Sequence, residues 1–410
     1  MILQLHGRIR AALAIALALC ASATSATPRC EGKLLRQQID ESQQVTLTQL
    51  RARNLAEVQA RMDGFLQAYE AGRLSDEELF YEFGAFDRWS PALTPIFQEW
   101  VERFPKSFAA HQAMALHLSA VAWQMRGGAL AKDTSRKQLE EFTGRLTRAR
   151  EWTVRATKLH PKPILAYQQL VANARALQAH DGLYKALGLN ARGPFTPSAS
   201  NPRPDVVPLL EAGNRFQPDN VIVRLAYVDV LAPRWGGSLQ ALEEYSRPSS
   251  HPGLPAQQLA AVVYTAALEI GGDFEFTKQP DKAIVFYELA ATACRLNQPY
   301  MNIARIRVDQ RRWSDALVAA DAAIAIAPGS KNGQRWKAYA LSGLGRHAEA
   351  VALLQKLSAD GDPDVAYFLG EYYLHGGGGL PLDMREARRL FSIAARAGDE
   401  RAIKRLAELR

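Results

Sequence analysis

The sequence predicts an all-α protein built as an α-solenoid of antiparallel helix pairs. No stretch of the chain alternates apolar and polar residues for long enough to favour a β-strand. Residues 313–316 (Trp-Ser-Asp-Ala) recur 34 residues later as 347–350 (His-Ala-Glu-Ala), and residues 281–283 begin a similar helix one unit earlier. Repeats of this length are typical of stacked helical hairpins, in which each unit buries its apolar face only against its neighbours.

Residues 1–26 have the layout of a secretory signal peptide. Two arginines precede an apolar run at 11–19, and small residues follow at 21–26. The run is too short to span a membrane, so we expect no membrane span and an exported, periplasmic protein. Cys20 lies in a segment that weakly resembles a bacterial lipoprotein box, and lipid anchoring there is the alternative to soluble export.

The cysteines and the charge narrow the classes of function. Beyond a signal peptide only Cys30 and Cys294 remain, and neither has a partner at metal-ligand spacing. Cys294 lies in an apolar helical stripe, so we expect a packed thiol there, although a bridge to Cys30 stays open. The net charge of +8 is dispersed through the helices without a contiguous basic stripe, so we expect no nucleic-acid partner.

Residues 27–245 are predicted to form a helical domain. Ser75 precedes three acidic residues and predicts a helix N-cap. A loop rich in proline and serine covers 192–204, and a second such stretch at 246–255 marks the boundary to further domains at 246–360 and 361–410. Apolar residues at intervals of three and four indicate helices over 34–71, 91–104, 108–124, 137–159 and 164–178.

Three segments of this domain carry distinctive motifs. Residues 122–128 (Ala-Trp-Gln-Met-Arg-Gly-Gly) end a helix, residues 149–167 have the pattern helix, proline break, helix, and residues 233–238 are Pro-Arg-Trp-Gly-Gly-Ser. Over 76–245 these motifs resemble a bacterial family labelled a domain of unknown function, whose helix pairs are similar to tetratricopeptide repeats. The resemblance implies a fold and brings no catalytic role.

The same motifs supply the candidate partner-binding residues, which are Trp123, Arg126, Arg234 and Trp235. Arginine binds carboxylates through paired hydrogen bonds, and tryptophan offers a large stacking surface. In the alternative interpretation the tryptophans anchor helix pairs, the glycines close the turns, and Ser238 is the N-cap of the helix that begins at Leu239.

Residues 246–360 resemble tetratricopeptide repeats. Trp313 and the closing Pro328 take the positions that the family gives to a large residue and a helix-ending proline. The small residues between them recur at helical spacing, and they are Ala316, Ala320, Ala323 and Ala327. A generic alanine-rich helical bundle is the alternative.

Residues 361–410 resemble a Sel1-like repeat followed by a capping helix. Gly370 permits close helix contact, glycines at 376–379 make the turn, and Asp383 caps the second helix. We expect Ala387, Ala394 and Ala395 of that helix to face the first one. The glycine run lacks the lysine and the serine or threonine of a phosphate-binding loop, so it predicts no cofactor.

These features favour an exported scaffold that binds protein or peptide partners through a concave groove. No nucleophile-turn, zinc-peptidase or dinucleotide motif occurs, so we expect no catalytic residue, cofactor or metal. His111 and His117 are six residues apart and do not share a helix face as metal ligands would. An enzyme, or enzyme subunit, with a cleft in a helical array is the first alternative.

A carbohydrate or cell-wall binder is the second alternative. Its stacking platforms would be Trp89, Trp100, Trp123 and Trp235. The identity of the partner and the oligomeric state stay open.

Overall fold

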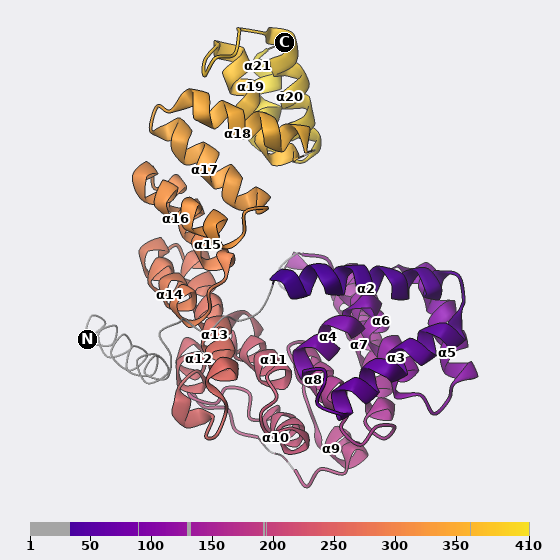
Figure 1. Cartoon of the computed structure of the whole chain (residues 1–410). Helices are drawn as coiled ribbons and strands as arrows, with labels where there is room; N and C mark the ends of the chain where they lie inside the picture. The colour runs from indigo at the N-terminus through magenta and orange to yellow at the C-terminus, as the bar shows by residue number, and fades with distance from the viewer. Residues whose placement is uncertain are drawn as a thin grey trace. The chain divides into compact units, whose positions relative to one another are not determined.

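The computed structural model describes residues 33–88, 90–128, 133–191, 193, 195–360 and 362–409, with side chains from residue 40 onward. These residues form α-helices joined by turns and short 3-10 helices, with no β-strand among them (Figure 1). The all-α prediction is confirmed. The predicted signal peptide at 1–26, together with Cys20, Cys30 and Trp89, lies outside the described residues. Within the described part, no helix is both long and apolar enough to cross a membrane.

The chain divides into two compact units, with the boundary between Asp273 and Phe274. That boundary falls near the end of α13 (Ala256–Phe276), whereas the sequence placed its division before this helix. The domain ranges 27–245, 246–360 and 361–410 stay a prediction. The other α-helices of unit 1 are α2 (Lys33–Arg51), α3 (Leu55–Glu70), α4 (Asp76–Phe83), α5 (Thr94–Arg103), α6 (Phe108–Arg126), α7 (Arg136–Ala156), α8 (Ile164–Asn173), α9 (Asp181–Leu187), α10 (Val207–Phe216), α11 (Ile222–Leu231) and α12 (Leu239–Tyr245).

Local sequence sets where these helices begin. The Ser75 hydroxyl accepts a hydrogen bond from the Glu78 amide at 3.2 Å, and the Glu78 carboxylate accepts one from the Ser75 amide at 2.7 Å. Ser238 caps α12 in the same way, by accepting from the Ala241 amide at 3.0 Å. Both predicted N-caps are therefore confirmed. The predicted helix at 34–71 is two helices, because the chain turns at Arg53, where φ is 59°.

The first helices of unit 1 enclose an aromatic core. Trp100 is fully buried, and its indole nitrogen donates a hydrogen bond to the Gln59 side-chain oxygen at 2.9 Å. Its ring centroid lies 5.4 Å from that of Phe86, which in turn lies 5.9 Å from that of Phe97. A tryptophan without exposed surface cannot stack on a sugar, so the role of Trp100 as a carbohydrate platform is wrong.

The predicted loop at 192–204 is described except at residues 192 and 194, and it is attached to the helices around it. Arg203 donates a hydrogen bond to the Ala174 carbonyl at 2.8 Å, just past the end of α8, and forms an ion pair with Asp205 at 2.9 Å. Phe195 packs against Tyr184 of α9 with ring centroids 5.6 Å apart. The described part of this loop is therefore held by contacts at both ends.

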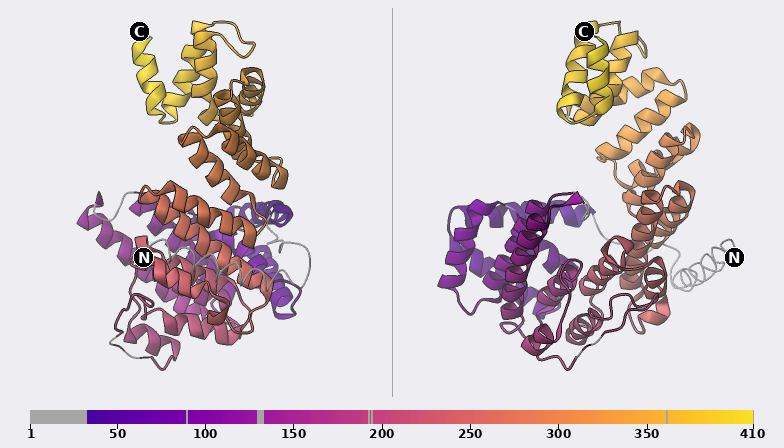
Figure 2. Two further views of the ribbon diagram at one scale, coloured as in Figure 1. Left: turned by 90° about the vertical axis from the view of Figure 1, so that its left-hand side faces the viewer. Right: turned by 180° about the vertical axis from the view of Figure 1, so that it is seen from behind.

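Unit 2 is an array in which successive helices from α14 to α21 pack side by side (Figures 1 and 2). The predicted alanine stripe lies inside it, because Ala316, Ala320 and Ala323 have no exposed surface. The helix that carries the stripe ends two residues before Pro328, as predicted. The helices are α14 (Pro280–Ala293), α15 (Asn297–Asp309), α16 (Trp313–Ile326), α17 (Lys331–Gly343), α18 (His347–Ala359), α19 (Ala366–His375), α20 (Met384–Arg396) and α21 (Glu400–Glu408).

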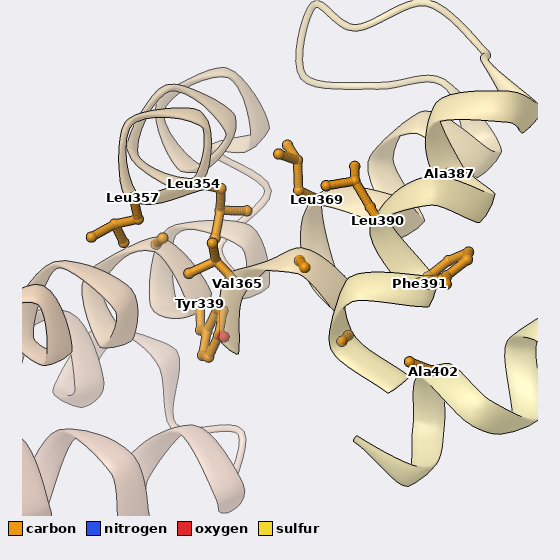
Figure 3. Close-up of a cluster of buried hydrophobic side chains, with 12 residues drawn as sticks. Tyr339, Leu354, Leu357, Val365, Leu369, Ala387, Leu390, Phe391 and Ala402 are labelled. Carbon is orange, nitrogen blue, oxygen red and sulfur yellow. The ribbon is translucent and has the colours of Figure 1, made fainter. Parts of the chain in front are cut away.

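The last helices of unit 2 close around one apolar cluster (Figure 3). Leu354 of α18, Leu369 of α19 and Phe391 of α20 are buried members of it. Gly370 is needed here, because a Cβ atom at this position would lie 2.8 Å from the Phe391 ring. Asp383 accepts hydrogen bonds from two amides of the first turn of α20, at 2.9 and 3.0 Å. The close helix contact and the N-cap expected of the Sel1-like repeat are both confirmed.

Cys294 directly follows the last residue of α14, and the state of its sulfur differs from the one predicted. It is fully buried, as expected, but it is disulfide-bonded rather than a packed thiol. An apolar stripe shows that a cysteine faces the core, whereas its sulfur chemistry depends on a tertiary neighbour that no local pattern reveals.

Candidate functional site

The four predicted partner-binding residues come together in unit 1. Trp123 lies in the last turn of α6, and Trp235 ends the 3-10 helix η4 (Pro233–Trp235). Their rings meet edge to face, with centroids 5.5 Å apart and an interplanar angle of 77°. Arg126 follows Trp123 by one helical turn, and its guanidinium carbon lies 5.8 Å from the Trp123 ring centroid.

Glycines shape the turns that carry these side chains. Gly127 ends α6 with a φ of 72°, a conformation that costs little only for glycine. Gly236 follows Trp235 with a φ of 85°, and a methyl group at Gly237 would overlap the backbone of Leu231. The glycines therefore close the turns, as the alternative interpretation held, and in doing so they place the two tryptophans in contact.

A fifth residue, Arg175, joins the set and was missed from the sequence. It lies in the irregular turn that follows α8, and its guanidinium carbon is 5.2 Å from the Trp123 ring centroid and 5.7 Å from that of Trp235. Cation–π contacts of this kind favour a fixed arrangement of the rings and the charge. We call Trp123, Arg126, Arg175, Arg234 and Trp235 the Trp–Arg site.

Two of the three arginines are paired with carboxylates. Arg175 Nη1 lies 3.5 Å from Oδ2 of Asp229 in α11, and Arg234 Nη1 lies 2.5 Å from Oε2 of Glu269 in α13. Arg126 has no carboxylate within ion-pair distance among the described residues; it donates to the Gly127 carbonyl at 3.3 Å and also lies over the Phe142 ring. The guanidinium group of Arg126 is thus the cation of the site that remains available to a carboxylate.

Burial and neighbouring charges shift the pKa values of Arg175, Asp229 and Arg234. Burial lowers the pKa of the Arg175 guanidinium, against the opposing effect of Asp229. Burial likewise raises the pKa of the Asp229 carboxyl, while Arg175 lowers it. For Arg234, burial lowers the pKa, but the hydrogen bond and charge of Glu269 outweigh burial, so that the net shift is upward. Charges at such a site interact more strongly than they would in bulk water.

The Trp–Arg site is accessible at the surface of unit 1. The Arg234 side chain is 52 % exposed, and Trp123, Arg126, Arg175 and Trp235 are half-buried. These five side chains can stack and donate hydrogen bonds, and none of them is a nucleophile or a proton carrier near neutral pH. The arrangement is therefore suited to binding.

His111 and His117, which the sequence did not favour as metal ligands, both lie in the core. His117 is fully buried and stacks on Phe97 with ring centroids 4.6 Å apart. His111 is also buried, and its Nδ1 lies 2.9 Å from the Ser107 carbonyl oxygen. No group of three metal-ligating side chains is found in the described part of the chain.

Two protein-family models match parts of the chain. The model described as a domain of unknown function (DUF4034) matches residues 35–202, and the Sel1 repeat model matches residues 269–293 and 363–399. The first match begins and ends earlier than the predicted range of 76–245, so it includes Trp123 and Arg126 but not Arg234 and Trp235. A search of curated proteins gave no significant match.

Solved structures of helical-repeat proteins are similar to the chain at low identity. Yeast Tom70 aligns over 82 % of this chain and 61 % of its own, with 13 % identity and a TM-score of 0.44. The chain therefore spans less than two thirds of the Tom70 chain. A protective antigen of uropathogenic Escherichia coli with an SLR fold, c5321, aligns over 92 % and 82 %, with 14 % identity and a TM-score of 0.38.

The TPR domain of P58(IPK) aligns over 91 % of this chain and 97 % of its own, with 11 % identity and a TM-score of 0.26. The family matches and the helix pairs of the structure confirm the resemblance seen in the sequence. The chain is all-helical, with one segment that matches the DUF4034 model and two that match the Sel1 repeat model.

Proposed function

We propose that the protein is an exported scaffold that binds protein or peptide partners, both on the concave face expected of its C-terminal repeats and at the Trp–Arg site. Helical-repeat folds present extended surfaces suited to protein–protein interaction. The observation that carries the proposal is the contact of two half-buried tryptophans beneath an arginine without a carboxylate partner. Tryptophan and arginine are the residues most enriched among energetically dominant interface positions.

The charges of the site indicate the chemistry of the partner. Arg175 and Arg234 already have carboxylates of this chain, whereas Arg126 has none among the described residues. A carboxylate of the partner, from an acidic side chain or a chain terminus, would complete the site by a charge-assisted hydrogen bond to Arg126. We therefore propose an acidic residue of the partner at this position.

Aromatic side chains on the first helices of the repeats support a second contact surface. The rings of Tyr367 and Phe368 in α19 are half-buried, and the Arg401 guanidinium carbon lies 4.4 and 5.0 Å from their centroids. The Phe368 ring packs against the buried Tyr339 ring of α17, with centroids 3.9 Å apart. The Tyr339 ring in turn packs against the half-buried Trp336 ring, with centroids 5.6 Å apart. The half-buried rings of this row, Trp336, Tyr367 and Phe368, would give a partner contact area at low entropic cost.

Two observations support export. The sequence at 1–26 has the pattern of a signal peptide. Cys294 is disulfide-bonded, and structural disulfides form and persist in oxidising compartments such as the periplasm.

In-cell crosslinking of the tagged full-length chain, followed by mass spectrometry, tests the proposal. Arg126→Gln removes the available cation. Arg136→Gln is a matched control, because the Arg136 side chain is 94 % exposed and, among the described residues, its ion pair is with Glu140 of its own helix. We expect a recurrent protein that the wild type and Arg136→Gln capture and Arg126→Gln captures at least several-fold less. Equal capture by Arg126→Gln would exclude the Trp–Arg site as the contact, and capture of no protein by any version would overturn the scaffold function.

A further inference from the structure

A separate cavity of about 620 Å³, widely open to solvent, lies beside the start of α6 in unit 1. Its walls are α3, the turn between α5 and α6, and the segment that follows α7 at residues 159–160. This volume lies in the range of small-ligand sites, roughly 300–1,000 Å³. None of its lining residues belongs to the Trp–Arg site.

The cavity is lined by charges of both signs that do not neutralise one another. Asp63 and Glu70 lie along α3, and Arg103 and Lys106 lie at the end of α5 and in the turn after it. Within the described residues, no ion pair joins either acid to either base. Asp63 accepts a hydrogen bond from the uncharged amide of Gln59 at 2.8 Å. The two acids and the two bases are therefore free to meet charges of a ligand.

His160 contacts the Glu70 carboxylate, and the neighbours of His160 determine which of its ring nitrogens carries the proton. Only 8 % of the His160 side chain is exposed, and its ring packs 5.1 Å from that of Phe108. Nδ1 accepts a hydrogen bond from the Lys162 amide at 3.1 Å, so the ring proton lies on Nε2, which is 3.1 Å from a Glu70 carboxylate oxygen. Burial lowers the pKa of His160, against the effect of Glu70. A neutral histidine thus orients the Glu70 carboxylate without cancelling its charge.

Apolar side chains also line the cavity. Leu66 of α3 and Phe108 at the start of α6 are buried, and both line the cavity. A ligand that fills this space would place aliphatic or peptide groups on an apolar floor while its charged ends reach the walls. Small-molecule sites commonly combine an apolar lining with a few placed polar groups in this way.

We propose that this cavity binds a small zwitterion, either a short peptide with free termini or an amino acid, with its ammonium group at Glu70 and its carboxylate at Arg103 and Lys106. The proposal is independent of the protein-binding function, because it uses other residues and a ligand of another size. The shared chemistry is a positive and a negative group joined by a short apolar or peptide segment.

Isothermal titration calorimetry of the purified full-length chain with alanine, dialanine and trialanine tests the proposal and shows which ligand length binds best. We expect saturable binding of at least one of these probes, and at least tenfold weaker binding when its amine is acetylated or its carboxyl is amidated. Binding of the blocked forms with unchanged affinity, or no binding of any probe at millimolar concentration, would overturn the proposal.

Variants assign the charged ends. Arg103→Gln should weaken binding of the free peptide about tenfold and leave binding of the amidated peptide unchanged. Glu70→Gln should likewise weaken binding of the free peptide and leave binding of the peptide with an acetylated amine unchanged. Glu102→Gln is the control for both, because Glu102 is exposed beside Arg103 and does not line the cavity. Circular dichroism shows whether each variant is folded, and the exposed Arg103 supplies the test should Glu70→Gln unfold. Equal affinities for the wild type and Arg103→Gln would refute the assigned orientation and with it the proposal.

Discussion

The Asp76 carboxylate accepts a hydrogen bond from the Val221 amide at 2.7 Å, across 145 residues of chain. The same oxygen accepts a second bond from the Ile222 amide at 3.1 Å, so a side chain in the first turn of α4 satisfies the first amides of α11. Burial raises the pKa of Asp76, and the two amide bonds act against that rise. Val221, the N-cap residue of α11, has no side-chain cap bond of its own, and Asp76 supplies the acceptor from a distant part of the sequence.

We expect Asp76→Ala to lower the free energy of unfolding by about 2–3 kcal/mol, because it leaves two buried amides without an acceptor. Asp76→Asn keeps one oxygen acceptor and should cost roughly half as much. Urea denaturation followed by circular dichroism measures both. A loss in Asp76→Asn as large as in Asp76→Ala would show that charge, rather than the acceptor, makes the contribution.

The alanine stripe of α16 gives a second prediction. Ala316 has no exposed surface, whereas Val318 on the same helix is 71 % exposed. Ala316→Arg forces a long charged side chain into a close helix contact, and we expect a loss of about 3 kcal/mol or more. Val318→Arg is the matched control and should change stability by less than about 0.5 kcal/mol. Equal melting temperatures for the wild type and Ala316→Arg would refute the packing of this helix.

The interior of the Trp–Arg site can be tested through Arg175 and Asp229. Arg175→Ala leaves the half-buried Asp229 carboxylate without its cation, and we expect a loss of about 2–3 kcal/mol in unfolding free energy. Asp229→Asn in the same chain should recover part of that loss, because it removes the uncompensated charge. A double-mutant cycle measures the coupling. Strict additivity of the two changes would contradict the ion pair.

His251 predicts a loss of stability in acid. It is buried, its Nε2 lies 2.6 Å from the Tyr245 carbonyl oxygen, and burial lowers its pKa to about 4, which the hydrogen bond opposes. The folded-state pKa therefore lies below the ordinary value of about 6.5. The stabilisation by the neutral ring is complete above about pH 6.5 and is lost as the pH falls through about 4.

Between pH 7 and pH 4 we expect the unfolding free energy of the wild type to fall roughly 2–3 kcal/mol further than that of His251→Gln, whose side chain does not titrate. His375→Gln is the control, because the His375 side chain is 66 % exposed. Unfolding titrations at several pH values give the difference. Parallel pH profiles for the wild type and His251→Gln would show that this ring does not carry the effect.

The disulfide at Cys294 can be detected chemically. Alkylation of the denatured, unreduced protein should leave Cys294 unlabelled, and reduction before alkylation should label it completely, as read by peptide mass spectrometry. Non-reducing peptide mapping then identifies the cysteine to which it is joined. Full labelling of Cys294 without a reductant would restore the original prediction of a packed thiol.

Local patterns predicted the parts of the fold that neighbouring residues determine. Ser75, Ser238 and Asp383 could be predicted as N-caps, because each side-chain oxygen accepts a hydrogen bond from an amide only two or three residues further along the chain. The burial of Ala316 and Ala320 followed from helical spacing in the same manner. Such features require no knowledge of which helices meet.

Contacts between distant segments escaped prediction. Arg175 lies in an irregular turn without a motif, and only the packing of α6, α8 and η4 brings it over two tryptophans. The cavity between α3 and His160 is likewise made by three separate segments. Trp100 shows the same limit, because a tryptophan's position in a helical pattern does not distinguish a surface platform from a core ring bonded to Gln59.

Two glycines set the distances between neighbouring helices in unit 2. A methyl group at Gly343 would overlap the Trp313 ring, and one at Gly370 would touch Phe391. In each case an aromatic ring of one helix rests directly on the main chain of a neighbouring helix, so the absence of a side chain lets the two helix axes lie close together. Because every later helix is positioned on the one before it, a change of a single ångström at Gly343 would displace each residue from α18 to α21, and surfaces that never touch this glycine would lose their alignment.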